Sequence, residues 1–257
     1  MTLDNKFDPK YCKERFEGKG LARKIFNLFI KNIKIENREF LSNLNCRKVY
    51  VSPHWSHLDE AVLLVAIYNS SNNIEMGPRI IAKKTYLYDL VNIFGFLDKF
   101  GAIAVKDNKN PVKMKRLAKN ILNNSDLLFF PNYSRDFDGI INLKPLIFSS
   151  ILEYALNNDV YVCPVNINYE PRYVEEPIMP YLDYINELMV NDKLNKKIGG
   201  IGKLVLDLSC YFSAPLRGKI EANVCFKKPI NAREFLYEDL GKGARMLAKR
   251  AQDYVLS

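Results

Sequence analysis

The sequence predicts a single α/β domain with a largely parallel mixed sheet flanked by helices, preceded by an N-terminal amphipathic helical segment. Short apolar stretches alternate with longer amphipathic ones, the pattern of strands joined by helical crossovers. The chain has 257 residues, of which 48% are hydrophobic, enough for one full core. No internal repeat or Pro/Gly-rich linker divides it. We therefore expect an N-terminal helical segment at residues 1–40 and one domain at 41–257.

The alternation assigns most of the chain to strands and helices. Strands are expected at residues 47–52, 79–82, 102–105, 126–130, 160–169 and 219–226. Helices are expected at residues 58–68, 111–122, 145–156 and 232–256. Pro111 stands in the first turn of its helix, where a missing N–H costs nothing. The last helix is either continuous or broken near Gly241.

The N-terminal segment contains a basic amphipathic pattern. Apolar residues recur at three- and four-residue spacing between residues 21 and 34, which predicts a helix. Four cations lie off this stripe: Arg23, Lys24, Lys31 and Lys34. Two interpretations stay open. The helix either docks on an anionic membrane surface or packs on the core with a solvated basic face.

Composition narrows the class of protein. Lys and Arg exceed Asp and Glu by 38 − 29 = 9, which suggests an anionic partner such as a nucleic acid, a lipid surface or a phosphorylated substrate. No nucleic-acid-binding motif is present, so we expect no nucleic acid partner. The five cysteines form no C-x-x-C pair, which favours reduced thiols in the cytoplasm. No secretory signal or long apolar run suggests export or a membrane span.

One short stretch concentrates reactive side chains. The sequence HWSHLD contains both histidines, His54 and His57, and ends at Asp59. It directly follows a predicted strand, and ligands of open α/β sheets bind at the carboxyl ends of strands. A loop between His54 and Asp59 can bring the carboxylate to the imidazole, giving a His–Asp dyad for general-base catalysis. Two alternatives are helix capping by Ser56 with Asp59, and a metal site of His54, His57 and Asp59.

These residues resemble the H-x-S-x-x-D block of the glycerolipid acyltransferase family, the 1-acylglycerol-3-phosphate and glycerol-3-phosphate acyltransferases. Three later stretches resemble the family's further blocks in the same order. They are residues 81–107, LLFFPNYSRDFDG at 127–139, and VCPVNINYE at 162–170. The resemblance covers residues 47–170.

The resemblance implies an acyl transfer at His54. His54 would take a proton from an acceptor hydroxyl, Asp59 would orient His54, and the alkoxide would attack an acyl thioester of coenzyme A or acyl carrier protein. No metal or other cofactor is implied. Arg135 would hold the acceptor phosphate, because a guanidinium matches phosphate oxygens. The full set of implied substrate-binding residues is Ser56, Lys106, Asn132, Ser134, Arg135 and Lys144.

The chain also departs from the family pattern. Asn132, Tyr133 and Ser134 replace the usual Glu-Gly-Thr, and Pro53 replaces the usual Asn before the histidine. We expect a cytoplasmic, peripheral enzyme on the inner face of the membrane, with 1-acylglycerol-3-phosphate as acceptor. Glycerol 3-phosphate is the alternative acceptor. A non-catalytic lipid-binding or scaffolding homologue is the alternative from another class.

Overall fold

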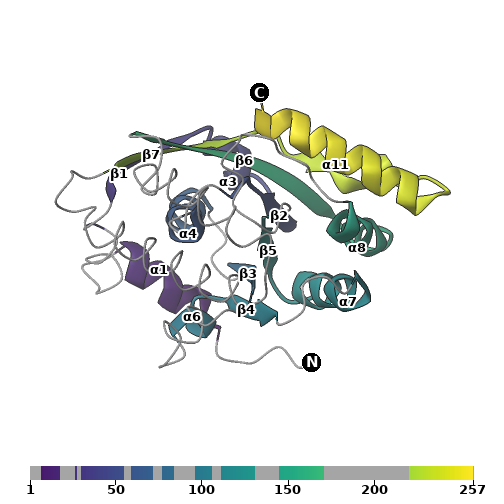
Figure 1. Ribbon diagram of the computed structural model, residues 1–257, viewed down its shortest axis with the longest axis horizontal. Helices are drawn as coiled ribbons and strands as arrows, with labels where there is room; N and C mark the ends of the chain where they lie inside the picture. Colours follow the sequence, from purple (N-terminus) through teal and green to yellow (C-terminus); the bar gives the residue numbers. More distant parts are fainter. Residues whose placement is uncertain are drawn as a thin grey trace, which may run out of the picture.

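The computed structural model describes residues 7–17, 27, 30–54, 59–71, 77–83, 96–105, 111–130, 145–170 and 220–256. Its strands are β1 (Ile30–Glu36), β2 (Arg47–Val51), β3 (Pro78–Lys83), β4 (Ala102–Val105), β5 (Asp126–Phe129), β6 (Val160–Glu170), β7 (Ile220–Phe226) and β8 (Ile230–Asn231). They form one sheet in the order β1-β7-β6-β2-β5-β3-β4, with β8 beside β6 (Figure 1).

The sheet is mixed but mostly parallel. Parallel pairs join β1 to β7, β2 to β5 and β6, and β3 to β4 and β5. The antiparallel pairs among the described strands join β6 to β7 and β6 to β8. The predicted α/β fold class with a largely parallel mixed sheet is confirmed.

Helices cover both faces of this sheet. They are α1 (Pro9–Glu17), α3 (Glu39–Ser42), α4 (Asp59–Ser70), α6 (Phe96–Lys99), α7 (Pro111–Leu122), α8 (Leu146–Ala155) and α11 (Leu240–Leu256), with a 3-10 helix η2 (Ala232–Phe235). Figure 1 shows α1 and α4 on one side of the sheet and α7, α8 and α11 on the other. All of α4 between residues 62 and 68 is buried, as expected for a helix that is apolar on every side.

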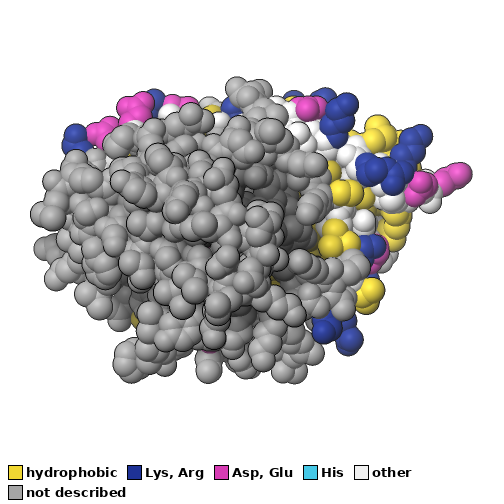
Figure 2. Space-filling view, viewed as in Figure 1, with side chains coloured by type: hydrophobic (Ala, Val, Ile, Leu, Met, Phe, Trp, Pro, Cys, Tyr) yellow, Lys and Arg dark blue, Asp and Glu magenta, His cyan; other side chains and the backbone are white. Residues whose placement is uncertain are grey.

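The outer helices are amphipathic instead. In α7, Met114, Ala118 and Ile121 are buried, whereas Lys113 and Arg116 are exposed. Figure 2 shows Lys and Arg side chains interspersed with hydrophobic ones on the side of α7 and α11. Among the described residues, no helix has the length and hydrophobicity needed to cross a bilayer.

The predicted helix at residues 21–34 is wrong in its last part. Residues 30–34 belong to β1, which pairs in parallel with β7. Apart from Asn27, residues 18–29 lie outside the described residues. Ile30 and Ile33 fit a helical spacing, but Ile33 and Ile35 also fit the alternation of a strand, and pairing with β7 decides between them. The N-terminal segment therefore contributes a strand to the sheet.

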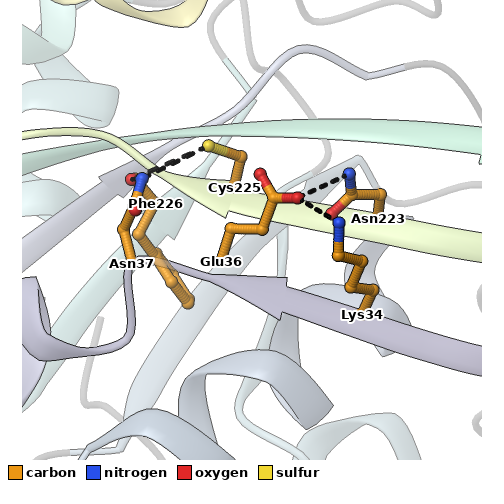
Figure 3. Close-up of polar contacts among 6 residues, drawn as sticks. All are labelled: Lys34, Glu36, Asn37, Asn223, Cys225 and Phe226. Carbon is orange, nitrogen blue, oxygen red and sulfur yellow. Dashed lines mark hydrogen bonds and ion pairs between the residues drawn. The ribbon is translucent and has the colours of Figure 1, made fainter.

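Polar side chains fasten β1 to β7 (Figure 3). The Glu36 carboxylate accepts from Lys34 Nζ at 2.7 Å and from Asn223 Nδ2 at 3.3 Å. Asn37 follows with a φ of 57°, a left-handed conformation that asparagine tolerates, and its Nδ2 donates to Phe226 O at 2.9 Å. Lys31 pairs with Glu221 of β7 at 2.8 Å. Two of the cations expected on a membrane-docking helix thus pair with carboxylates at this sheet edge.

The predicted helix at residues 232–256 is also corrected. The 3-10 helix η2 ends at Phe235, and α11 begins at Leu240. Gly241 lies inside α11, so the break precedes it. The remaining predicted strands and helices agree with the structure to within two residues at each end.

Candidate active site

The parallel strands β2 and β5 end side by side, and the neighbouring strand β6 continues past them. In the register of the sheet, Val51 of β2 pairs with Phe129 of β5 and with Pro164 of β6. His54 follows Val51 by three residues, and Phe130 directly follows β5. His54 therefore follows the carboxyl end of β2, next to that of β5, the position that open α/β sheets use for ligands.

The imidazole of His54 meets the carboxylate of Asp59. The distance from His54 Nδ1 to Asp59 Oδ2 is 3.1 Å, within hydrogen-bond range. Asp59 is the first residue of α4 and is fully buried, whereas the His54 side chain is 16% exposed. The pair thus combines a buried carboxylate with an imidazole that solvent can reach.

A tyrosine completes the surroundings of this carboxylate. The hydroxyl of Tyr169 donates to Asp59 Oδ1 at 2.6 Å. Tyr169 belongs to the part of β6 in which Val165 and Ile167 are also buried, in alternation with more exposed residues. Each oxygen of Asp59 therefore has a donor, as a carboxylate without access to water requires.

Two further groups border the imidazole. The Phe130 ring lies 4.6 Å from the His54 ring, measured between centroids, at an interplanar angle of 30°. The Oε1 of Glu60 lies 3.9 Å from His54 Nε2, beyond hydrogen-bond range. Phe130 limits how far the imidazole can tilt, and Glu60 places negative charge near its outer nitrogen.

This arrangement sets the roles of the two ring nitrogens. A carboxylate offers only hydrogen-bond acceptors, so Nδ1 of His54 carries the proton and donates to Asp59. Nε2 is then the nitrogen that can accept a proton. The arrangement is chemically suited to general-base catalysis, in which the carboxylate supports the imidazolium that forms.

The other predicted site residues lie outside the described residues. These residues are Ser56, Lys106, Asn132, Ser134, Arg135 and Lys144. His57 also lies outside the described residues. No role was predicted for Tyr169, Phe130 or Glu60. Tyr169 and Phe130 each lie in a stretch quoted for its family resemblance, and each stands near a strand end. Their contacts with the dyad depend on strand pairing that the sequence alone does not display.

The two alternatives for this stretch fare differently. Capping by Ser56 and Asp59 leaves unexplained why the Asp59 carboxylate contacts His54 and Tyr169. For the metal alternative, the described part of the chain holds no group of three His, Cys, Asp or Glu side chains that could bind a metal ion. His57 is not among those residues.

The buried thiols of Cys12 and Cys163 are poor candidates for a nucleophile. Burial raises the pKa of Cys12 to about 12, and it also raises the pKa of Cys163. A thiol in such surroundings stays protonated at neutral pH and is a poor nucleophile. Of the described groups, the His54–Asp59 pair is therefore the stronger candidate for chemistry.

Comparison with known proteins finds similarity among solved structures alone. No family model matches the chain, and no curated protein matches it. Among solved structures, the chain is similar to the crystal structure of the 1-acyl-sn-glycerophosphate (LPA) acyltransferase PlsC from Thermotoga maritima. The identity is 14% and the TM-score is 0.49, with 95% of this chain and 78% of that chain covered. Any assignment of function therefore depends on the site and on the sequence motifs.

Proposed function

We propose that the chain is an O-acyltransferase that moves a fatty acyl group from an acyl thioester to the hydroxyl of 1-acylglycerol-3-phosphate. The observation that carries this proposal is the 3.1 Å contact between His54 Nδ1 and Asp59 Oδ2 beyond the carboxyl end of β2. These two residues have the H-x4-D spacing of the glycerolipid acyltransferases, and the sequence resemblance extends over three further blocks.

The proposed chemistry begins with a proton transfer. Nε2 of His54 takes the proton of the acceptor hydroxyl while that oxygen attacks the thioester carbonyl carbon. The tetrahedral intermediate collapses, the C–S bond breaks, and the thiolate leaves with the proton from the imidazolium. The products are an ester and a free thiol, and His54 returns to its starting state. Because a thiolate leaves readily, the enzyme mainly has to align two substrates and a base.

Asp59 serves this cycle by holding His54. Its hydrogen bond keeps the proton on Nδ1, so that Nε2 faces the acceptor hydroxyl in the basic form. The carboxylate then stabilises the imidazolium that forms after proton transfer. The donor substrate in this proposal is acyl-CoA or an acyl carrier protein, with no metal or other cofactor.

The acceptor phosphate would be bound by cations contributed from the loops. Arg135 is the first candidate, because its guanidinium can form two parallel hydrogen bonds to phosphate oxygens. Lys106 and Lys144 are further candidates, and Ser56, Asn132 and Ser134 would bind the polar parts of the substrates. An anionic membrane surface would supply the lipid acceptor to the basic chain.

Glycerol 3-phosphate is a second candidate acceptor. The sequences GAIAV at 101–105 and PVNINYE at 164–170 resemble the glycerol-3-phosphate branch of the family more closely. The replacement of Glu-Gly-Thr by Asn132, Tyr133 and Ser134 also motivates a non-catalytic lipid-binding homologue.

A substrate screen tests the proposal. The purified chain is incubated with acyl-CoA or acyl-loaded carrier protein, together with lysophosphatidate, other lysolipids or glycerol 3-phosphate, and products are identified by mass spectrometry. We expect an ester product with lysophosphatidate that disappears in His54→Ala. Lipid binding without any ester product would favour the non-catalytic homologue.

A further inference from the structure

Tyr169 is connected to the candidate site from a distant part of the chain. It is separated from Asp59 by 110 residues, yet its hydroxyl lies 2.6 Å from Asp59 Oδ1. The residue is only 6% exposed. Its backbone is fixed by the antiparallel pairing of β6 with β7, in which Tyr169 stands opposite Ala222. The hydroxyl is therefore held by the sheet rather than by a loop.

The Asp59 carboxylate is held at both of its oxygens. Tyr169 donates to Oδ1, and His54 Nδ1 contacts Oδ2. A carboxylate with a single partner can turn about its Cβ–Cγ bond, whereas two partners on different elements fix its plane. With Oδ1 fixed by the sheet, Oδ2 is directed at the imidazole.

We propose that Tyr169 is a positioning residue of the active site, whose hydroxyl holds Asp59 so that His54 keeps its proton on Nδ1. This inference rests on the proposed function for its effect on catalysis. Tyr169 acts through Asp59 and is assigned no contact with substrate. The hydrogen-bonded sequence Tyr169–Asp59–His54 joins β6, the start of α4 and the end of β2.

Tyr50 offers a matched control. It is a fully buried tyrosine of β2, and its hydroxyl has no hydrogen-bond partner within the described residues. Replacing it with Phe removes the same atom from the same sheet without touching Asp59. A general effect of deleting a buried hydroxyl would appear in Tyr50→Phe as well as in Tyr169→Phe.

The first test measures kinetics and the state of the imidazole together. In Tyr169→Phe we expect kcat to fall about 10- to 100-fold, the loss typical of one hydrogen bond to a charged group, with KM changed less than about threefold. Tyr50→Phe should keep both values. A rate equal to that of wild type in Tyr169→Phe would overturn the proposal.

The second test does not need turnover. The chain has only two histidines, so ¹⁵N-labelled histidine gives two sets of ring signals, and His57→Gln assigns them. The ¹⁵N shifts of neutral His54 should show the Nδ1–H form in wild type and in Tyr50→Phe. They should show a larger share of the Nε2–H form in Tyr169→Phe. An unchanged distribution in Tyr169→Phe would overturn the proposal.

A third variant covers the case in which Tyr169→Phe does not fold. A ring-fluorinated tyrosine at position 169 keeps the shape and makes the hydroxyl a stronger donor to Asp59. The carboxylate then supports the imidazolium less, so the acid limb of the kcat/KM profile should move to lower pH. Asp59 and Glu60 are the described charged groups that face His54, and Glu60 is unchanged here. An acid limb that stays in place would contradict the inference.

The outcomes separate the two proposals. If wild type forms no ester with any substrate pair, the proposed function fails, while the imidazole signals still decide the role of Tyr169. If wild type is active and His54→Ala is inactive, but Tyr169→Phe matches wild type in rate and imidazole form, only the role of Tyr169 fails.

Discussion

The Nζ of Lys48 lies 3.8 Å from Asp126 Oδ2, and both side chains are buried where β2 and β5 begin. The backbone N–H of Lys48 also donates to Asp126 Oδ1 at 3.0 Å. Burial raises the pKa of Asp126 to about 7, and the charge of Lys48 opposes that rise. This ion pair lies at the amino ends of the strands whose carboxyl ends carry the candidate active site.

This pair predicts a pH-dependent stability. The folded-state pKa of Asp126 is raised above the ordinary value of 3.8, so the folded state binds more protons than the unfolded state between pH 4 and about 7. Its contribution to the free energy of unfolding is therefore present at low pH and lost as pH rises through that window. In Lys48→Met the Asp126 carboxylate loses its partner. We expect the free energy of unfolding to fall by about 3–5 kcal/mol at pH 8.5.

The loss should be smaller at pH 5.5, where Asp126 can take up a proton. Urea denaturation at both pH values measures the difference. The double variant Lys48→Met with Asp126→Asn serves as control, because it removes both charges of the pair. It should lose less stability at pH 8.5 than Lys48→Met alone. An equal loss at both pH values for Lys48→Met would contradict this interpretation of the pair.

Asp59→Asn is predicted to remove most activity without unfolding the chain. The amide can present its NH₂ group to Nδ1 and favour the wrong imidazole tautomer. In a serine protease the same change lowers kcat about 10⁴-fold, and we expect a fall of about 10³- to 10⁴-fold here. Asp126→Asn removes another buried carboxylate, at the start of β5, and should keep kcat. Comparable losses of activity in both variants would show that the effect is structural.

Two glycines of α11 provide a stability test of the packing against η2. A Cβ at Gly243 would clash with Phe235 O and lie 3.0 Å from Leu152 Cδ1, so Gly243→Ala should lower the free energy of unfolding by about 3 kcal/mol. A Cβ at Gly241 would meet the exposed side chains of Asp239, at 3.0 Å, and of Arg245, at 3.8 Å. Alanine favours helix, so Gly241→Ala should change stability by less than about 1 kcal/mol. Similar melting temperatures for the two variants would be incompatible with this packing.

Arg135→Lys tests the proposed phosphate contact. Lysine keeps the positive charge but loses the forked pair of donors, so the KM for lysophosphatidate should rise about tenfold with kcat little changed. Steady-state kinetics with varied acceptor at saturating donor measures this. Arg23→Lys is a control, since it makes the same change outside the quoted blocks. An unchanged KM in Arg135→Ala would remove Arg135 from the acceptor site.

The sheet and most of its helices could be predicted from the sequence because their patterns are local. The apolar stretches at 47–52 and 126–130 are short and bounded by polar residues. The apolar residues of 111–122 recur with the spacing of a helix and not with that of a strand. Residues 30–36 were ambiguous, since the isoleucines there fit both periods over so short a length. Pairing with β7, almost 190 residues further along the chain, decides their conformation.

The break before α11 was not predictable for a related reason. The stretch FLYEDL at 235–240 contains no Gly or Pro, and Gly241 is the first residue that commonly breaks a helix. The structure places the break earlier, where Gly243 lets α11 pass close to the backbone of Phe235. A close approach between two segments leaves no periodic signal in either of them.

Only part of the candidate site could be predicted from the sequence. His54 and Asp59 are five residues apart, so their meeting could be predicted from a loop of suitable length. Tyr169 meets Asp59 only because β6 lies beside β2 and extends past it to pair with β7. Sequence order does not reveal which strands are neighbours, and so the third member of the group could not be predicted.

The central claim is that His54 is the base of an acyl transfer. Its most direct test compares the rates at which wild type, His54→Ala and His57→Ala convert acyl-CoA and lysophosphatidate to the diacyl product, with melting curves recorded for all three. We predict that His54→Ala lowers kcat/KM by about 10²- to 10⁴-fold, as expected for loss of a general base, and leaves the melting temperature unchanged. His57→Ala should stay within about tenfold of wild type. Full activity in His54→Ala, or equal losses in both variants, would contradict the account.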